Sequence, residues 1–135
     1  MKITTIPFVE HLGIQQEQNH LVLEPSRILE NHIGTIHASV QFTLAESQSG
    51  LFLQTEFPDI GEVIALLRSS TVKYKLPAKS KLIAKASMTQ ESKEKFMAQF
   101  TKKGRAAITV QVEIQDREQC VTMMGEFIWF IQRGS

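Results

Sequence analysis

The stretch from Asn31 to Thr55 reads NHIGTIHASVQFTLAESQSGLFLQT, and it predicts one long, buried helix at the centre of the protein. We expect the helix from about Ile36 to Gln54, because apolar residues occupy most of its circumference. Glu46 is the only Lys, Arg, Asp or Glu residue in this stretch. A carboxylate in such a helix is expected to be desolvated, which is costly unless the group is paired, hydrogen-bonded or protonated. Glu46 is therefore the first candidate for a chemical role.

The chain has 135 residues, enough to bury a core and too few for two domains, so we expect a single domain over residues 1–135. A net charge of +1 argues against nucleic-acid binding, which usually comes with a basic surplus. Basic residues cluster between Lys73 and Lys85 and between Lys93 and Arg105. These clusters suit a phosphate-bearing small ligand, although solvated faces are the commoner explanation.

Neither a disulfide nor a membrane segment is expected. Cys120 is the only cysteine, so no internal disulfide can form. The N-terminal MKITTIPFVEHLG lacks the long apolar run of a secretory signal. The longest apolar stretches, such as Phe127 to Ile131, are too short to span a bilayer. These features together predict a cytoplasmic protein.

The rest of the chain predicts mostly strands. Before the long helix we expect a short helix or turn over Thr5 to Leu12 and a first strand over Ile14 to Leu23. Alternation is cleanest where Ile108, Val110, Val112 and Ile114 face one way and polar residues face the other. After the long helix, the patterns predict a strand over Glu62 to Leu76, a strand over Lys81 to Gln90, a helix over Glu91 to Lys103, and strands over Ala106 to Gln115 and Cys120 to Gln132.

Short turns link most of these strands, which favours an antiparallel sheet. The order of elements predicts an α+β protein in which a curved antiparallel sheet of about five strands wraps around the long helix. The second face of the sheet needs cover in so small a domain, which favours a homo-oligomer.

The residues around the start of the long helix resemble the signature of a known family. Asn31-His32-Ile33-Gly34-Thr35-Ile36-His37-Ala38-Ser39, followed by Leu44-Ala45-Glu46 and Gly50, is similar to the motif of hotdog-fold acyl-CoA thioesterases, in the group typified by the phenylacetic-acid-pathway thioesterase. That motif has an Asn, a Gly, His-Gly-Gly six residues after the Asn, and Asp or Glu nine residues after the His. Asn31, His37 and Glu46 match both spacings.

The resemblance implies a hotdog fold and hydrolysis of an acyl-CoA thioester to a free carboxylic acid and CoA, without a metal or cofactor. Glu46 would act as general base or nucleophile, and the N–H of Ala38 at the helix start would polarise the thioester carbonyl. His37 and Asn31 would position the thioester or the attacking water. The carboxylate and the oxyanion donors of the family come from different subunits, so a homodimer or homotetramer with sites at the subunit interface is implied. The resemblance also assigns substrate contacts to Gly34, Ser39, Gly50, Ser70 and Thr71.

The sequence departs from the family pattern at two places. The paired glycines of the family are Ala38 and Ser39 here, and the helix over Glu91 to Lys103 is longer than the usual connection. Some members of this fold bind acyl-CoA without hydrolysing it, so a non-catalytic acyl-CoA- or fatty-acyl-binding module is the alternative. A hydratase or dehydratase is a weaker alternative, because its chemistry would need a His and an acid paired within one subunit. The spacing of His37 and Glu46 along the helix does not bring their side chains together.

Each candidate residue also has a purely structural explanation. Glu46 would be a buried acid hydrogen-bonded across a dimer, His37 a helix-start residue, and Asn31 a loop or capping residue. The other histidines lack metal-ligand spacing with a Cys or carboxylate cluster, so no metal site is expected. The bulky apolar residues expected first in the core, and second along an acyl tunnel, are Phe42, Phe52, Met123, Met124 and Phe127. The acyl group, and the choice between CoA and carrier-protein thioesters, stay open.

Overall fold

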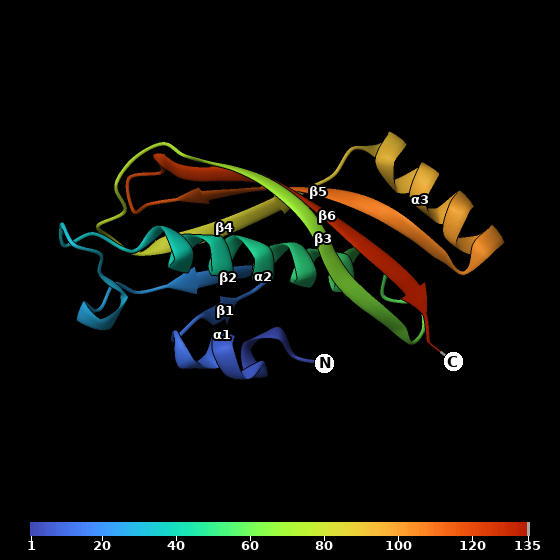
Figure 1. The fold of residues 1–135 in the computed structure, drawn as a ribbon, viewed down its shortest axis with the longest axis horizontal. Coiled ribbons are helices and arrows are strands. Elements are labelled where there is room, and N and C mark those ends of the chain that lie inside the picture. The colour runs from blue at the N-terminus through green and yellow to red at the C-terminus, as the bar shows by residue number, and fades with distance from the viewer. Residues whose placement is uncertain (135) are drawn as a thin grey trace.

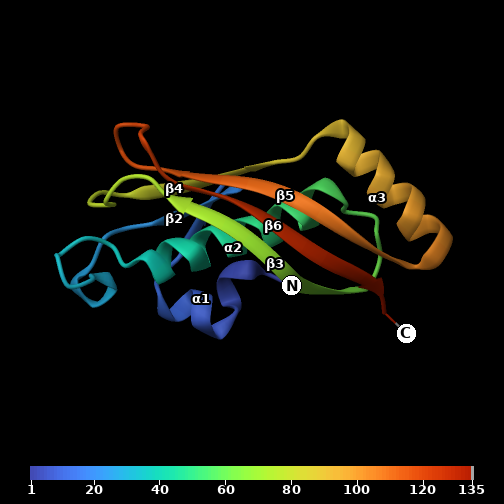
Figure 2. The same cartoon turned by 45° about the horizontal axis from the view of Figure 1, so that its top comes forward.

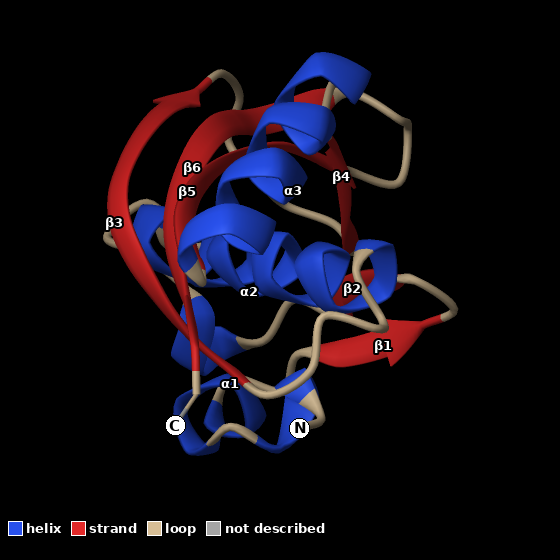
Figure 3. Ribbon diagram, turned by 90° about the vertical axis from the view of Figure 1, so that its right-hand side faces the viewer, coloured by secondary structure: helices blue, strands red, loops and turns tan. Residues whose placement is uncertain are grey.

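One six-stranded sheet curves around one long helix, α2, which spans Ala38–Glu56 (Figure 1, Figure 3). The structure is a computed structural model that describes residues 1–134; the predicted domain limit, Ser135, lies outside the described residues. None of the helices in this part of the chain is both long and apolar enough to cross a membrane.

Every neighbouring pair of strands is antiparallel, as predicted. The strands lie in the order β1-β2-β4-β5-β6-β3, so β3 pairs with the last strand of the chain rather than with β4. Their bounds are β1 Gln15–Glu17, β2 His20–Leu23, β3 Val63–Tyr74, β4 Leu82–Ser87, β5 Arg105–Gln115 and β6 Val121–Arg133. The remaining elements are two 3-10 turns, η1 Ile3–Thr5 and η2 Arg27–Leu29, and the helices α1 Pro7–His11 and α3 Gln90–Lys103.

The prediction of a single strand over Ile14 to Leu23 is wrong. The segment is a hairpin in which Gln15 pairs with Val22 and Glu17 with His20. The chain reverses at Gln18, whose φ of 58° lies in the left-handed region. No glycine marks this turn in the sequence, so the residues on either side read as one continuous strand. The hairpin is why the sheet has six strands instead of about five.

The long helix lies where the sequence predicts it, and its start and end each differ from the prediction by two residues. Leu44 and Ala45 are fully buried, and two glutamines on the same helix are nearly so. The Gln48 side chain accepts a hydrogen bond from the N–H of Leu21 (2.6 Å) and donates one to the carbonyl of Asn19 (3.0 Å). Buried polar groups are tolerated when they are hydrogen-bonded in this way. These bonds fix α2 to the β1–β2 hairpin.

The inner face of the sheet supplies the core that packs on α2. Ile108, Val110, Val112 and Ile114 are all buried, which confirms the alternation predicted for β5. Thr122 of β6 is fully buried and donates its hydroxyl hydrogen to the side chain of Gln41 (2.8 Å). The sheet and the helix are therefore joined by apolar packing along the middle and by side-chain hydrogen bonds at both flanks.

Helix α3 lies beyond the C-terminal end of α2 (Figure 2). The ring of Phe96 packs 5.2 Å from that of Phe57, and Lys93 bonds Glu56 with 2.7 Å between Nζ and Oε1. Thr89 caps the start of α3 by accepting a hydrogen bond from the backbone N–H of Ser92. Strand β4 therefore ends at Ser87, three residues before the predicted end at Gln90. Gly104, at φ 71°, ends the helix as predicted.

Strand β3 forms one edge of the sheet. It pairs with β6 from Val63↔Arg133 to Tyr74↔Met123, and within residues 1–134 no strand pairs with its other edge. Most of its side chains are exposed, including the large apolar residues Ile64 (56%) and Leu66 (61%). Such an edge presents free backbone N–H and C=O groups to another chain.

Candidate active site

The carboxylate of Glu46 lies half-buried in the middle of α2. Burial raises the pKa of this group above its ordinary value, and no charge or hydrogen bond in residues 1–134 offsets the effect. The salt bridges in this part of the chain, Lys81 with Glu17 and Lys93 with Glu56, do not involve it. The desolvation predicted for Glu46 is therefore confirmed, whereas its catalytic role stays a prediction.

His37 caps the N-terminus of α2. Its Nδ1 accepts a hydrogen bond from the backbone N–H of Ser39 at 3.0 Å and lies 2.8 Å from the Ser39 hydroxyl. A backbone N–H can only donate, so Nδ1 must be unprotonated and the neutral ring carries its proton on Nε2. The side chain is exposed, and Nε2 is thus a hydrogen-bond donor available to a ligand. This geometry suits a positioning role and also confirms the helix-start interpretation.

The backbone N–H of Ala38 has no acceptor within residues 1–134. The first amides of a helix have no partner inside the helix and carry the positive end of its dipole. Ala38 also lines a cavity of about 250 Å³. An oxygen that gains negative charge during a reaction is stabilised at such a position.

Asn31 organises the loop that precedes α2. Its Oδ1 accepts hydrogen bonds from the N–H groups of Ile33 and Thr35, both at 3.0 Å, and its Nδ2 donates to the Thr35 hydroxyl at 2.8 Å. Gly34 completes the loop at φ 79°. The interpretation of Asn31 as a loop residue is thereby confirmed. One hydrogen of its amide is unused by this set of bonds, because an NH₂ group has two.

The small cavity brings Asn31 and Ala38 together with residues that sequence reasoning missed. Tyr74, the last residue of β3, and Lys75, which follows it, also line this cavity. Burial raises the pKa of the Tyr74 phenol. The only sequence signal for this wall is the basic cluster between Lys73 and Lys85, which reaches the cavity at Lys75.

Within one chain, Glu46 does not join this group. It stands eight residues after Ala38, about 12 Å along the helix axis, and it lines neither this cavity nor the larger one described next. Ser70 and Thr71 are exposed on β3, where they pair with Phe127 and Glu126, and they line neither cavity.

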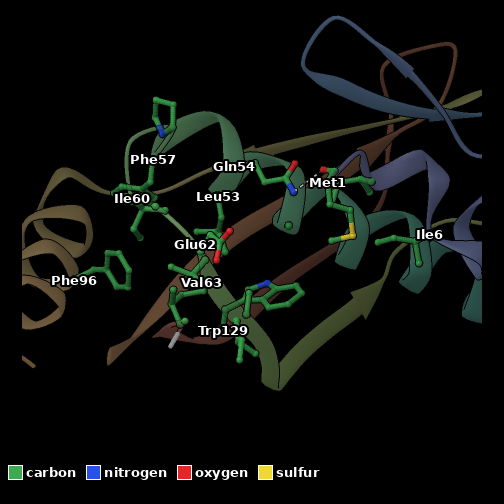
Figure 4. Close-up of a pocket in the computed structure, with 18 residues that line it drawn as sticks. Met1, Ile6, Leu53, Gln54, Phe57, Ile60, Glu62, Val63, Phe96 and Trp129 are labelled. Atoms are coloured by element: carbon green, nitrogen blue, oxygen red, sulfur yellow. Dashed lines mark hydrogen bonds between the residues drawn. The ribbon is translucent and has the colours of Figure 1, made fainter. Parts of the chain in front are cut away.

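A second cavity, of about 940 Å³, lies beside the C-terminal half of α2 (Figure 4). Gly50 lines it, and so does Trp129 from β6. The residues predicted as core first and acyl tunnel second line neither cavity; Met123 and Phe127 are fully buried in the core. Among residues 1–134, no three His, Cys, Asp or Glu side chains are grouped closely enough to hold a metal ion.

Solved structures share this architecture over nearly the whole chain. A Pseudomonas aeruginosa protein of unknown function, described as a "probable thioesterase", is 22% identical with a TM-score of 0.84, covering 98% of this chain and 91% of its own. A Bacillus halodurans protein solved with CoA is 18% identical with a TM-score of 0.72, covering 92% and 74%. A Haemophilus influenzae thioesterase is 14% identical with a TM-score of 0.72, covering 97% and 86%.

These similarities, with the sheet order and the central helix, confirm the predicted α+β hotdog fold. The chain belongs to the DUF4442 family, described as a domain of unknown function, whose model matches residues 3–131. No curated protein matches the chain in sequence.

Proposed function

We propose that the protein hydrolyses an acyl-CoA thioester to a free carboxylic acid and CoA, with Glu46 as the catalytic carboxylate. The observation that carries the proposal is the environment of Glu46: a carboxylate desolvated on a buried helix, with no charge or hydrogen bond in residues 1–134 to offset its burial. The thioesterase descriptions of similar structures, and the CoA held by one of them, support the choice of substrate class.

The reaction needs a base and a site for the developing oxyanion. Glu46 takes a proton from water, whose oxygen attacks the thioester carbonyl carbon, or it attacks that carbon itself as nucleophile. The carbonyl oxygen gains negative charge next to the free N–H of Ala38. Collapse of the tetrahedral intermediate breaks the carbon–sulfur bond, and the CoA thiolate leaves and takes up a proton. In the general-base route this step gives the free acid directly. In the nucleophilic route it leaves the acyl group on Glu46 as an anhydride, which water then hydrolyses to the free acid and the Glu46 carboxylate.

The two groups must come from two copies of the chain. Glu46 and Ala38 are about 12 Å apart along one helix, too far to act on a single carbonyl. The free edge of β3, with Ile64 and Leu66 exposed, offers a surface for a second copy. A homodimer, alone or within a tetramer, then places Glu46 of one copy opposite Ala38 and Asn31 of the other. Lys75 borders the small cavity and suits a phosphate of CoA.

The decisive experiment is a thiol-release assay with short-, medium- and long-chain and aromatic acyl-CoAs. Glu46→Gln should lower kcat by about a hundredfold or more, as expected when a general base is removed. Glu56→Gln is the matched control: the same substitution on the same helix, where Glu56 pairs only with Lys93. Near-normal turnover by the Glu46→Gln protein on a confirmed substrate would rule out the assignment.

A non-catalytic acyl-CoA-binding module is the second candidate, because the helix start offers fewer donors than the family motif implies. The N–H of Ser39 is already bonded to Nδ1 of His37, and those of Val40 and Gln41 are bonded to the His37 carbonyl, so within residues 1–134 Ala38 has the one free amide of this helix start. This reading predicts acyl-CoA binding without thiol release and with an affinity that Glu46→Gln leaves unchanged. Thiol release that depends on Glu46 excludes it.

A further inference from the structure

We propose that the 940 Å³ cavity beside the C-terminal half of α2 binds the acyl chain of the substrate, and that this chain is a medium to long aliphatic one. The inference rests on the proposed function, in which Glu46 marks the reacting end of the substrate. It adds the substrate class and names the residues that select it.

The cavity continues the helix face that carries Glu46. Gly50, Leu53 and Phe57 follow Glu46 by four, seven and eleven residues, and all three line the cavity. At about 100° per residue these four positions fall within roughly 60° of one another around the helix. The carboxylate therefore stands one turn before the first helical residue of the cavity, on the same face.

The length of this face suits an aliphatic chain. From Glu46 to its last residue, Glu56, the helix rises about 15 Å, and Phe57 follows directly. One leaflet of a bilayer holds its acyl chains in about half of a hydrocarbon core of about 30 Å. A chain with its carbonyl at Glu46 and its end near Phe57 is thus comparable in length to a lipid acyl chain, which a short or aromatic acyl group is not.

The lining is mostly apolar, with Gln54 and Glu62 as polar side chains, and it comes from four separate segments of the chain (Figure 4). The N-terminal segment contributes Ile3 and Ile6, α3 contributes Phe96, and β6 contributes Trp129. The indole N–H of Trp129 donates to the Ser49 hydroxyl at 2.8 Å, so its one polar atom is satisfied. A cavity of this size is typical of ligand sites, which range over about 300–1,000 Å³.

Gly50 is the lining residue of the cavity nearest to Glu46 along the helix. A Cβ atom there would lie 3.7 Å from Cδ1 of Ile3 and 3.9 Å from Cζ2 of Trp129, which is ordinary contact distance. A methyl group at Gly50 would therefore fit in contact with Ile3 and Trp129, whereas a leucine side chain would have to displace them or extend into the cavity.

Trp129 is the only tryptophan of the chain, so its fluorescence reports on the cavity directly. The test uses the Glu46→Gln protein, which keeps a substrate intact, and dodecanoyl-CoA brominated near the end of its chain. We expect quenching of Trp129 by this ligand and none by CoA alone. Quenching does not require hydrolysis, so it separates failure of this inference from failure of the proposed function.

Two variants narrow the cavity, and one matched control does not. Gly50→Leu adds bulk at the end of the cavity nearest to Glu46 and Ala65→Phe adds bulk on the β3 side, whereas Ala107→Phe makes the same change as Ala65→Phe at an exposed β5 position outside the cavity. We expect the first two to weaken quenching by the brominated ligand at least about tenfold and the control to leave it unchanged. In the wild-type protein, kcat/KM should rise by up to about fourfold per added methylene from butyryl-CoA to dodecanoyl-CoA.

The proposal is overturned if the brominated dodecanoyl-CoA binds in equilibrium dialysis while Trp129 fluorescence stays constant, because the chain then lies elsewhere. It is also overturned if Gly50→Leu and Ala65→Phe change the oligomeric state in sedimentation and leave acyl-CoA affinity intact, since the cavity would then belong to an interface between copies.

Discussion

Among the polar side chains of α2, the Glu46 carboxylate stands apart. Gln41 and Gln48 bond to the sheet and to the β1–β2 hairpin, and the Thr43 hydroxyl donates to the carbonyl of Ser39. The Ser49 hydroxyl donates to the carbonyl of Glu46 itself, at 2.6 Å. These four side chains form hydrogen bonds within the protein, whereas no charge or hydrogen bond in residues 1–134 offsets the desolvation of the Glu46 carboxylate.

This isolation gives a prediction about stability and pH. Burial raises the pKa of Glu46 in the folded protein, so between its ordinary pKa and the raised one the folded state binds more protons than the unfolded chain. Stability is then lost as the pH rises through that interval. Glu46→Gln removes the loss. The free energy of unfolding of the Glu46→Gln protein, relative to that of the wild type, should be constant at pH values below the ordinary glutamate pKa. It should increase between the ordinary and the raised pKa, and it should be constant again above the raised pKa.

Urea unfolding of both proteins at several pH values and one protein concentration measures this difference. Glu56→Gln serves as the control, because it makes the same substitution on the same helix at a carboxylate that pairs with Lys93. A difference between Glu46→Gln and wild type that does not change with pH would show that the carboxylate is not desolvated in solution.

At the scale of the element, two neighbouring backbone amides at the start of α2 differ, because one is hydrogen-bonded within the protein and the other is not. The N–H of Ser39 is bonded to His37, whereas the N–H of Ala38, a residue that lines the small cavity, has no partner within residues 1–134. His37 is extended, at φ −61° and ψ 140°, which is the conformation favoured before a proline. Proline is also well tolerated at the first position of a helix.

We therefore expect Ala38→Pro to delete the free N–H and keep the fold. Loss of one oxyanion donor typically lowers kcat by about a hundredfold to a thousandfold. Ala38→Gly, which keeps the N–H, should retain activity. Thiol-release kinetics give the rates, and circular dichroism checks the helix. Full activity in a folded Ala38→Pro protein would place the oxyanion elsewhere.

Elements with a local pattern could be predicted from the sequence. The alternation of β5 and the Gly104 end of α3 depend on neighbouring residues, and the central helix on a long uncharged stretch. The pairing of β3 with β6 could not, because it joins Val63 to Arg133 across most of the chain. The turn at Gln18 was missed because a glutamine seldom takes a positive φ.

The candidate site divides in the same way. Asn31 and Ala38 come together through a short loop, and their spacing in the sequence already indicates it. The large cavity is built from segments distant in sequence, so no motif marks Trp129 or Ile3 as part of it. The only sequence pattern that points to the cavity is the helical spacing from Glu46 to Gly50 and Phe57. This pattern can be interpreted only after the helix is known to be buried.

At the scale of the whole molecule, the composite site predicts complementation between inactive chains. A hybrid of a Glu46→Gln chain and an Ala38→Pro chain has one site with both defects and one site with none. Equal mixing of the two chains makes half of the dimers hybrids, so activity should recover to about a quarter of wild type. Thiol release after joint refolding measures it. An active monomer in sedimentation, or no recovery in a confirmed hybrid, would contradict the arrangement.

The edge position of β3 has a consequence for how the chain is made. The ribosome adds 59 residues between Tyr74, where β3 ends, and Arg133, where β6 ends. At about 5 to 20 residues per second this takes roughly 3 to 12 seconds, during which β3 has no strand to join. Its apolar part, Ile64 to Leu67, would be an aggregation hazard in that interval, but Arg68 to Thr71 follow it directly and interrupt the apolar run. The polar residues in the middle of β3 thus protect the nascent chain from aggregation before β6 has been made.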